Sequence, residues 1–299
     1  LEELRTAGRG ASAEALRDEL QTGFLATAWL VPSLQAESLQ RAAQARRGAG
    51  DGPATLGKSL LLAQAAMHAA FDGEPADQVA ELADRAWADG LLLSHSGSEG
   101  VGWDLTAAAL CLAGELEKAL AVADAALDHA RERGSPLAFA TASFVRGLPE
   151  LWRGQVASAV ADLELARDAR RFGWRQFTRS AAARLCLGLI ETGELKRAEA
   201  VLTEDAPIRS PYDLEDAVRL YALAELRLAQ GRYDEALVTA CTAGEAAEAT
   251  VPFLGFCSWR TCAAQAALAL GERDRGLALA AEAHERSGRT RVLHQQIRT

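Results

Sequence analysis

A short glycine-containing turn recurs along the chain at almost constant spacing. It reads FDGEP, LAGEL, WRGQV, ETGEL, AQGRY and ALGER, and its glycines are Gly73, Gly114, Gly154, Gly193, Gly231 and Gly271. Successive glycines are 41, 40, 39, 38 and 40 residues apart, which indicates a structural repeat. Each glycine follows one helical apolar stretch and precedes another, as a residue that ends a helix in the left-handed conformation does. The sequence therefore predicts a stack of similar helical units.

Small residues repeat on the flanks of these turns. Five residues after the glycine stand Ala119, Ala159, Ala198 and Ala236, with Gly276 in the last unit, and twelve residues after it stand Ala126, Ala166, Ala243 and Ala283, with Asp205 as the exception. Such residues allow the second helix of a pair to lie close to the first. No stretch has the alternation or β-branched character of a strand. We therefore predict an all-α fold, a right-handed α-solenoid of about seven helix-turn-helix pairs with a repeat near 40 residues.

This pattern resembles the tetratricopeptide repeat over roughly residues 71–285, although the units are longer than the 34-residue form and lack its closing proline. The expected organisation has three parts. Residues 1–70 form N-terminal helices (near 13–30, 34–46 and 55–71) that pack on the solenoid, and residues 71–288 form the tetratricopeptide-like repeats. Residues 289–299 are the start of a further helix or a truncated tail. Because Met67 is the only methionine, we expect the chain to be a segment of a longer polypeptide.

Charge and composition indicate which kinds of partner the chain can bind and in which cellular compartment it is expected. The net charge is −9, and an acidic surface repels the phosphate backbone, so we expect no direct nucleic-acid contact by this segment. The five cysteines form no CxxC pair and are interpreted as buried thiols of a reducing compartment. No apolar run has the roughly 18 residues of a membrane helix, and no signal-peptide pattern opens the chain. These features predict a cytoplasmic protein without membrane contact.

The stretch GPATLGKS, residues 52–59, matches the spelling of a nucleotide-binding phosphate loop, with Lys58 in the lysine position. A working loop follows a buried strand and precedes a helix, so that backbone N–H groups and the helix N-terminus point at the phosphates. The preceding residues are polar and helical, and no apolar strand ending in Asp is available to hold magnesium. We interpret the stretch as a glycine-rich loop between helices with a surface lysine, and a helical NTPase remains the remote alternative.

No other motif predicts catalysis or a cofactor. The five histidines are scattered and form no metal-ligand pair with each other or with cysteine. The glycine- and serine-rich stretch at 94–102 lacks the GxSxG order of a nucleophile elbow. We therefore predict no catalytic, cofactor-binding or metal-binding residue, and no enzymatic activity.

In a superhelix of this kind, the first helix of each pair lines the concave surface. Counting back thirteen, ten and six residues from each glycine gives the expected inward positions. The candidate ligand or partner groove is then Asp104, Thr141, Phe144, Leu148, Ser180, Leu187, Tyr221, Glu225, Ser258 and Gln265, with Val101, Ala108, Ala183, Val218 and Thr261 at the remaining positions. This groove is small, apolar and mildly acidic. It favours a peptide, a protein domain or an apolar small molecule over the acidic tails that Lys- and Asn-lined grooves bind.

Two longer stretches resemble one bacterial family. Residues 110–174, which begin LCLAGELEKALAVADAALDHARERG, and residues 256–288, which begin FCSWRTCAAQAALALGERDRG, are similar to the helical-repeat region of large LuxR-type regulators of the MalT-like class. In that family an ATPase module precedes the repeats and a helix-turn-helix module follows them, and no LuxR-type DNA-binding signature occurs in this chain. The resemblance implies a sensor and signal-transmitting segment of a transcriptional regulator.

The function predicted from the sequence is therefore non-enzymatic. The segment receives a protein, a peptide or a small-molecule inducer on its concave face and passes the change to neighbouring modules. The alternative is a free-standing scaffold for protein–protein interaction. Acidic helical repeats of this type also allow self-association, but nothing in the sequence specifies how.

Overall fold

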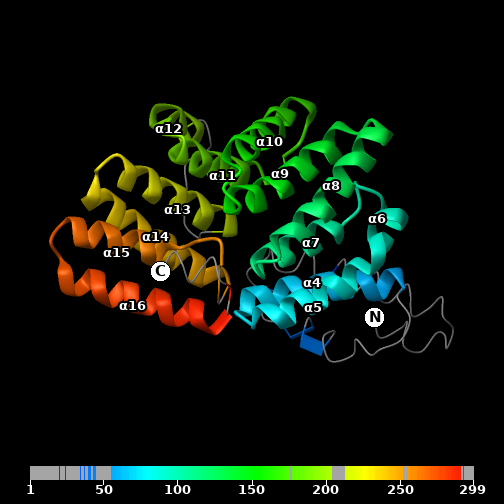
Figure 1. Ribbon diagram of the computed structural model, residues 1–299, viewed down its shortest axis with the longest axis horizontal. Helices are drawn as coiled ribbons and strands as arrows, with labels where there is room; N and C mark the ends of the chain where they lie inside the picture. Colours follow the sequence, from blue (N-terminus) through cyan, green and yellow to red (C-terminus); the bar gives the residue numbers. More distant parts are fainter. Residues whose placement is uncertain are drawn as a thin grey trace.

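A computed structural model describes residues 55–290 except 176, 204–212, 252 and 254, together with Val292 and scattered residues before 55. The described part is helical and contains no strand (Figure 1). Its helices are α4 (Leu56–Asp72), α5 (Ala76–Trp87), α6 (Leu91–Ser96), α7 (Trp103–Leu112), α8 (Leu116–Arg133), α9 (Pro136–Trp152), α10 (Val156–Asp168), α11 (Thr178–Glu191), α12 (Leu195–Thr203), α13 (Leu214–Ala229), α14 (Tyr233–Thr250), α15 (Trp259–Ala269) and α16 (Arg273–Thr290). Short 3₁₀ helices at Ala88–Gly90 and Ala169–Phe172 continue α5 and α10.

The repeated glycines join the helices in pairs. Six pairs, α4–α5, α7–α8, α9–α10, α11–α12, α13–α14 and α15–α16, are present in the part of the chain that the structure describes. All six glycines of the turns have positive φ, between 73° and 83°, which only glycine adopts at low cost. The predicted left-handed helix ends are thus confirmed, as is the all-α solenoid.

The pairs stack so that their first helices form one row and their second helices another. Successive first helices, α4, α7, α9, α11, α13 and α15, pack on one another. Each second helix before α16 packs between its own partner and the first helix of the next pair. Figure 1 shows the stack bending round in an arc, so that the C-terminal end of α16 comes near one end of α4 and α5. The first helices line the inside of this arc.

Small side chains set the distance between the two helices of a pair. Ala119, Ala159, Ala198 and Ala236, which follow the turns by five residues, are all fully buried. In the last pair, a Cβ on Gly276 would lie 2.7 Å from Cγ of Leu268, so only glycine fits there in the observed packing. The predicted role of these positions in close helix packing is confirmed.

Local caps fix where several inner helices begin. The hydroxyl of Thr55 accepts a hydrogen bond from the Lys58 amide at the start of α4. Ser135 caps α9 in the same way, with Pro136 as the first helical residue. Asp213 and Asp216 form a reciprocal capping box at the start of α13. Each such cap stabilises a helix by about 1 kcal/mol, because it pairs an amide that has no partner within the helix.

The expected helix at 55–71 is present as α4, which pairs with α5 around Gly73. The expected helices near 13–30 and 34–46 lie outside the described residues, apart from isolated positions. At the other end, α16 continues to Thr290, and residues 293–299 also lie outside the described part.

Candidate ligand-binding cavity

The connection between α14 and α15 returns to the first helix of the stack. The amide of Phe253 donates a hydrogen bond to the carbonyl oxygen of Phe71, near the end of α4, at 2.7 Å. The adjacent Gly73 turn lies directly against the Phe253 side chain, since a Cβ on Gly73 would be 3.3 Å from Cβ of Phe253. This clasp joins the first pair to the last two pairs and closes the arc on one side.

A cavity of about 90 Å³ lies inside the arc. Its walls come from α4, α7, α9, α11 and α13 and from the returning connection, and most of them are apolar. Met67, Phe71, Leu105, Leu148, Val218 and Phe256 are among the apolar residues that line it. The polar side chains in the lining are Asp104, Ser180 and Arg184, together with the thiol of Cys111. The cavity thus combines a large apolar surface with a few polar groups, as small-ligand sites do.

Aromatic rings form one wall of the cavity. The rings of Phe144 and Phe177 stack with centroids 5.1 Å apart and an angle of 9° between their planes. Trp174 packs on Phe144 at 5.9 Å, and its Nε1 donates to Oγ1 of Thr141 at 3.0 Å. Phe177, immediately before α11, has a φ of 58°, which is an uncommon and costly conformation for a bulky residue. That conformation brings the Phe177 ring onto Phe144.

Arg184 is the cation of the cavity. Its guanidinium carbon lies 4.1 Å from the centroid of the Phe144 ring and 5.9 Å from that of Phe256. Its Nη1 donates to the carbonyl oxygen of Phe144 at 3.2 Å, while its Nε is buried without a hydrogen-bond partner. Burial lowers the pKa of Arg184 to about 10, which leaves it charged at neutral pH. Among the described residues, no carboxylate lies within ion-pair distance of this guanidinium.

Asp104 and Cys111, both on α7, complete the ionisable groups of the lining. The carboxylate of Asp104 accepts a hydrogen bond from the Gly102 amide at 2.9 Å, and burial raises its pKa above the ordinary value. Burial also raises the pKa of Cys111 to about 12, so this thiol is neutral at pH 7. Neither group supplies a counter-charge that is paired with Arg184.

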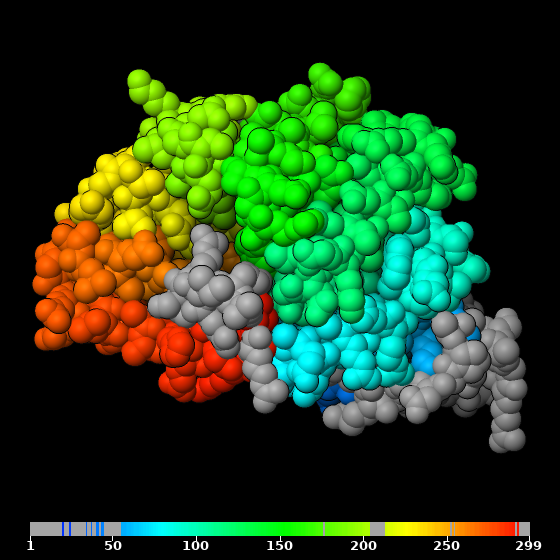
Figure 2. Space-filling view, viewed as in Figure 1, coloured from blue at the N-terminus to red at the C-terminus, as the bar shows by residue number. Residues whose placement is uncertain are grey.

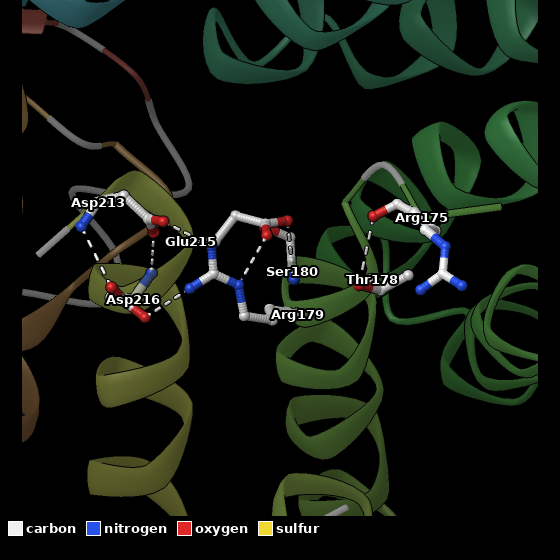
Figure 3. A network of polar contacts seen from close by, with 7 residues as sticks. All are labelled: Arg175, Thr178, Arg179, Ser180, Asp213, Glu215 and Asp216. Carbon is white, nitrogen blue, oxygen red and sulfur yellow. Dashed lines mark hydrogen bonds and ion pairs between the residues drawn. The ribbon is translucent and has the colours of Figure 1, made fainter. Parts of the chain in front are cut away.

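A polar network holds α11 against α13 beside the cavity (Figure 3). Arg179 donates to Glu215 at 3.0 Å, to Asp216 at 2.7 Å and to Asp213 at 2.5 Å. Glu215 also accepts a hydrogen bond from the Ser180 amide at 3.4 Å, and burial raises the pKa of Glu215. Because Ser180 and Arg184 are four residues apart on one face of α11, this network fixes the position of both.

Of the ten predicted groove residues, the structure brings four together in the cavity, namely Asp104, Phe144, Leu148 and Ser180. Ala108 and Val218, from the same count, also line it. Thr141 lies next to this wall as the acceptor for Trp174.

The other predicted residues lie elsewhere. Leu187 packs against the core, and Tyr221 is buried in it. Glu225 on α13 is half-buried outside the lining, and Gln265 is exposed on α15. Ser258 lines a second cleft, of about 70 Å³, near α14, α15 and α16.

Sequence reasoning missed Arg184, Phe177, Phe256, Met67 and Phe71. Arg184 carried a usable signal, because it is the only charged residue in the run SAAARLCLGLI, whose other residues are small or apolar. Phe256 carried none, since it reaches the cavity through a contact between segments that are distant in sequence.

The phosphate-loop spelling ends in a helix. Gly57, Lys58 and Ser59 belong to the first turn of α4, so the interpretation of 52–59 as a loop between helices is corrected for these residues. Lys58 is half-buried, and Ser59 is buried at 1% exposure. Residues 52–54 lie outside the described part. A hydroxyl as buried as that of Ser59 has no open face toward a magnesium–nucleotide complex.

The described residues lack a metal cluster and a membrane span. They contain no group of three or more His, Cys, Asp or Glu side chains that could hold a metal ion. They also contain no helix that is long and apolar enough to cross a membrane.

Comparison with known proteins links the chain to a solved structure. No family model matches the sequence, and no curated protein matches it significantly. The chain is similar to the crystal structure of Rap protein complexed with competence and sporulation factor, with a TM-score of 0.62 and 14% identity. The match covers 92% of this chain and 77% of that one. At this identity the likeness concerns the fold, and this chain therefore shares a helical-repeat fold with that protein.

Proposed function

We propose that this chain is the non-enzymatic, ligand-receiving segment of a bacterial transcriptional regulator. It takes a ligand in the cavity inside the arc and transmits the change along the helix stack to neighbouring modules. The observation that carries this proposal is the origin of the cavity walls. Helix α4, from the first pair, and Phe256, from the connection before the last pair, line the same space.

Such a cavity couples ligand binding to the shape of the whole stack. Each pair of a solenoid contacts only its neighbours, so small rotations between pairs add along the stack. A ligand that touches both ends of the arc differs in affinity between a closed and a more open arc, and a difference of this kind is what shifts a conformational equilibrium.

Two likenesses support the proposal. The similar structure of Rap protein is a complex with competence and sporulation factor, so a related fold holds another molecule. The repeat texture of 110–174 and 256–288 is similar to that of MalT-like regulators, which supports the regulatory setting.

The test introduces a substitution that fills the cavity of the protein and is made in the intact gene. Leu148→Trp places a large ring in the cavity, whereas Leu165→Trp adds the same ring at a side chain on α10 that is 49% exposed. We expect the first substitution to change transcript levels and the second to leave them as in the wild type, with both proteins folded by circular dichroism. Deletion of the gene without any change in transcripts would overturn the regulatory role.

A further inference from the structure

We infer that the cavity binds a small apolar organic acid, with its carboxylate on Arg184 and its hydrocarbon part against the Phe144–Phe177 wall. This inference names the ligand class for the proposed function and rests on it for biological meaning. The binding step itself stands on the contacts of the cavity.

The first argument is charge. Arg184 is half-buried, and taking part of a guanidinium out of water costs free energy unless an anion or further hydrogen bonds replace the lost water. Arg184 has one hydrogen bond, from Nη1, and its guanidinium carbon lies 4.1 Å and 5.9 Å from the centroids of two aromatic rings. In the described part of the chain, neither Nε nor Nη2 donates to any acceptor. An incoming carboxylate at this edge would take both N–H groups, in the two-point geometry that arginine offers.

The second argument is that nearby acids are already engaged. Glu215, which contributes to the electrostatic environment of Arg184, is held by Arg179 and by the Ser180 amide. Asp104 is held by the Gly102 amide. One cation without a paired anion matches a monoanion, whereas a phosphate dianion would be matched by a second cation, which the described lining does not contain.

The third argument is size and polarity. One water molecule needs about 15 Å³ of cavity volume of this kind, so a cavity of about 90 Å³ holds roughly six. Six waters occupy about 180 Å³ of liquid, which is the space of an organic molecule with about ten heavy atoms. A folded peptide segment is larger than this. The remaining walls, including Leu148, Val218 and Phe256, present only apolar atoms to the body of the ligand.

Calorimetric titration with phenylacetate tests the inference on the whole chain. The neutral isostere phenylacetamide is the matched ligand control. Arg184→Met removes the charge and keeps the length of the side chain. Arg197→Met, at an exposed arginine that pairs with Glu164, is the matched protein control. A charged hydrogen bond contributes about 1.5–3 kcal/mol, so we expect Arg184→Met to weaken phenylacetate binding roughly tenfold to a hundredfold.

The control measurements should leave affinity unchanged. Arg197→Met should bind phenylacetate as the wild type does, and Arg184→Met should bind phenylacetamide as the wild type does. Circular dichroism checks that each variant is folded, and Arg184→Lys, which keeps a charge, should bind with intermediate affinity.

Equal affinity of wild type and Arg184→Met for phenylacetate overturns the inference, as does equal affinity of the wild type for acid and amide. Absence of binding by phenylacetate, hexanoate and 4-methylpentanoate alike also overturns it. A separate titration uses peptides that end in Phe and compares them with their C-terminal amides. If these peptides bind and the free acids do not, the ligand of Arg184 is a peptide C-terminus and the inference of a free organic acid is overturned. None of these outcomes alters the transcript test of the proposed function, so the two can fail independently.

Discussion

Gly147 in the middle of α9 offers a sharp test of how the helix pairs pack. A Cβ at this position would lie 2.7 Å from Cγ and 2.8 Å from Cδ2 of Leu163 on α10. Leu163 is completely buried, so its side chain has no free space into which to move. The absence of a side chain at Gly147 therefore permits α9 and α10 to approach each other.

Two opposing terms set the effect of Gly147→Ala. Alanine is favoured over glycine in a helix by about 1 kcal/mol, while overpacking of a tight core costs about 1–3 kcal/mol. We expect a net loss of about 1 kcal/mol in the free energy of unfolding. In a Leu163→Ala background, which by itself costs about 2–5 kcal/mol, the clash disappears and the helix-propensity gain remains. Gly147→Ala should then stabilise by about 1 kcal/mol, which is a coupling of about 2 kcal/mol between the two sites.

The measurement is urea unfolding followed by circular dichroism and by tryptophan fluorescence, whose coincidence checks for a single transition. Gly288→Ala in α16 is the matched control, because a Cβ there meets no atom within 4 Å. It should stabilise by up to about 1 kcal/mol in either background. If Gly147→Ala behaves like this control, or has the same effect with Leu163 and with Ala at 163, close packing is not the reason for glycine at this position.

Three further predictions concern ionisation and capping. Burial beside Glu150 raises the pKa of Asp162 from 3.8 to about 6, despite its ion pair with Arg146 at 2.6 Å. Between these two pH values the folded protein therefore retains a proton that the unfolded chain has lost. The free energy of unfolding should therefore fall as the pH rises across that window, and Asp162→Asn should flatten the fall in a urea series at several pH values; an unchanged slope would refute the assignment. Of the five free cysteines only Cys241 is not buried, so iodoacetamide followed by mass spectrometry should label one thiol in the native protein and five in urea, and fast native labelling of a second would contradict the burial pattern. Asp213→Ala should cost about 1 kcal/mol in thermal or urea unfolding, because it removes the cap of α13, and an unchanged midpoint would show that the cap contributes nothing.

The repeat could be predicted from sequence because its determinants are local. Only glycine adopts the left-handed conformation at the end of a helix at low free-energy cost. Gly114 and Gly193 therefore reveal in the sequence where a helix ends in that conformation. The buried alanines, such as Ala159, follow each turn at a fixed offset, because the second helix meets the first at the same height in every pair. A period of about 40 residues transmits this geometry along the whole stack.

The cavity could be predicted only in part, because it depends on how each helix is rotated and on contacts between distant segments. A fixed count from the glycine places Asp104, Phe144 and Ser180 on the inner surface. The same count fails to bring Tyr221 and Gln265 into the cavity, since Tyr221 is buried in the core one turn beyond Val218 and Gln265 is exposed on α15. Neither Phe253 nor Phe256 belongs to a helix, so no helical period could position them.

The clasp between Phe253 and Phe71 alters how such a stack is expected to come apart. In an open array the terminal units lose their structure first, since each has a neighbour on one side only. Here the first pair gains a second neighbour through the hydrogen bond of Phe253 and the packing of Gly73. The stack is therefore closed by this contact, and unfolding that starts at the first pair is suppressed. During synthesis, the first pair gains this stabilisation only after the residues around Phe253 have been made. Protection of the Phe253 amide against hydrogen exchange then reports whether its hydrogen bond to Phe71 is formed.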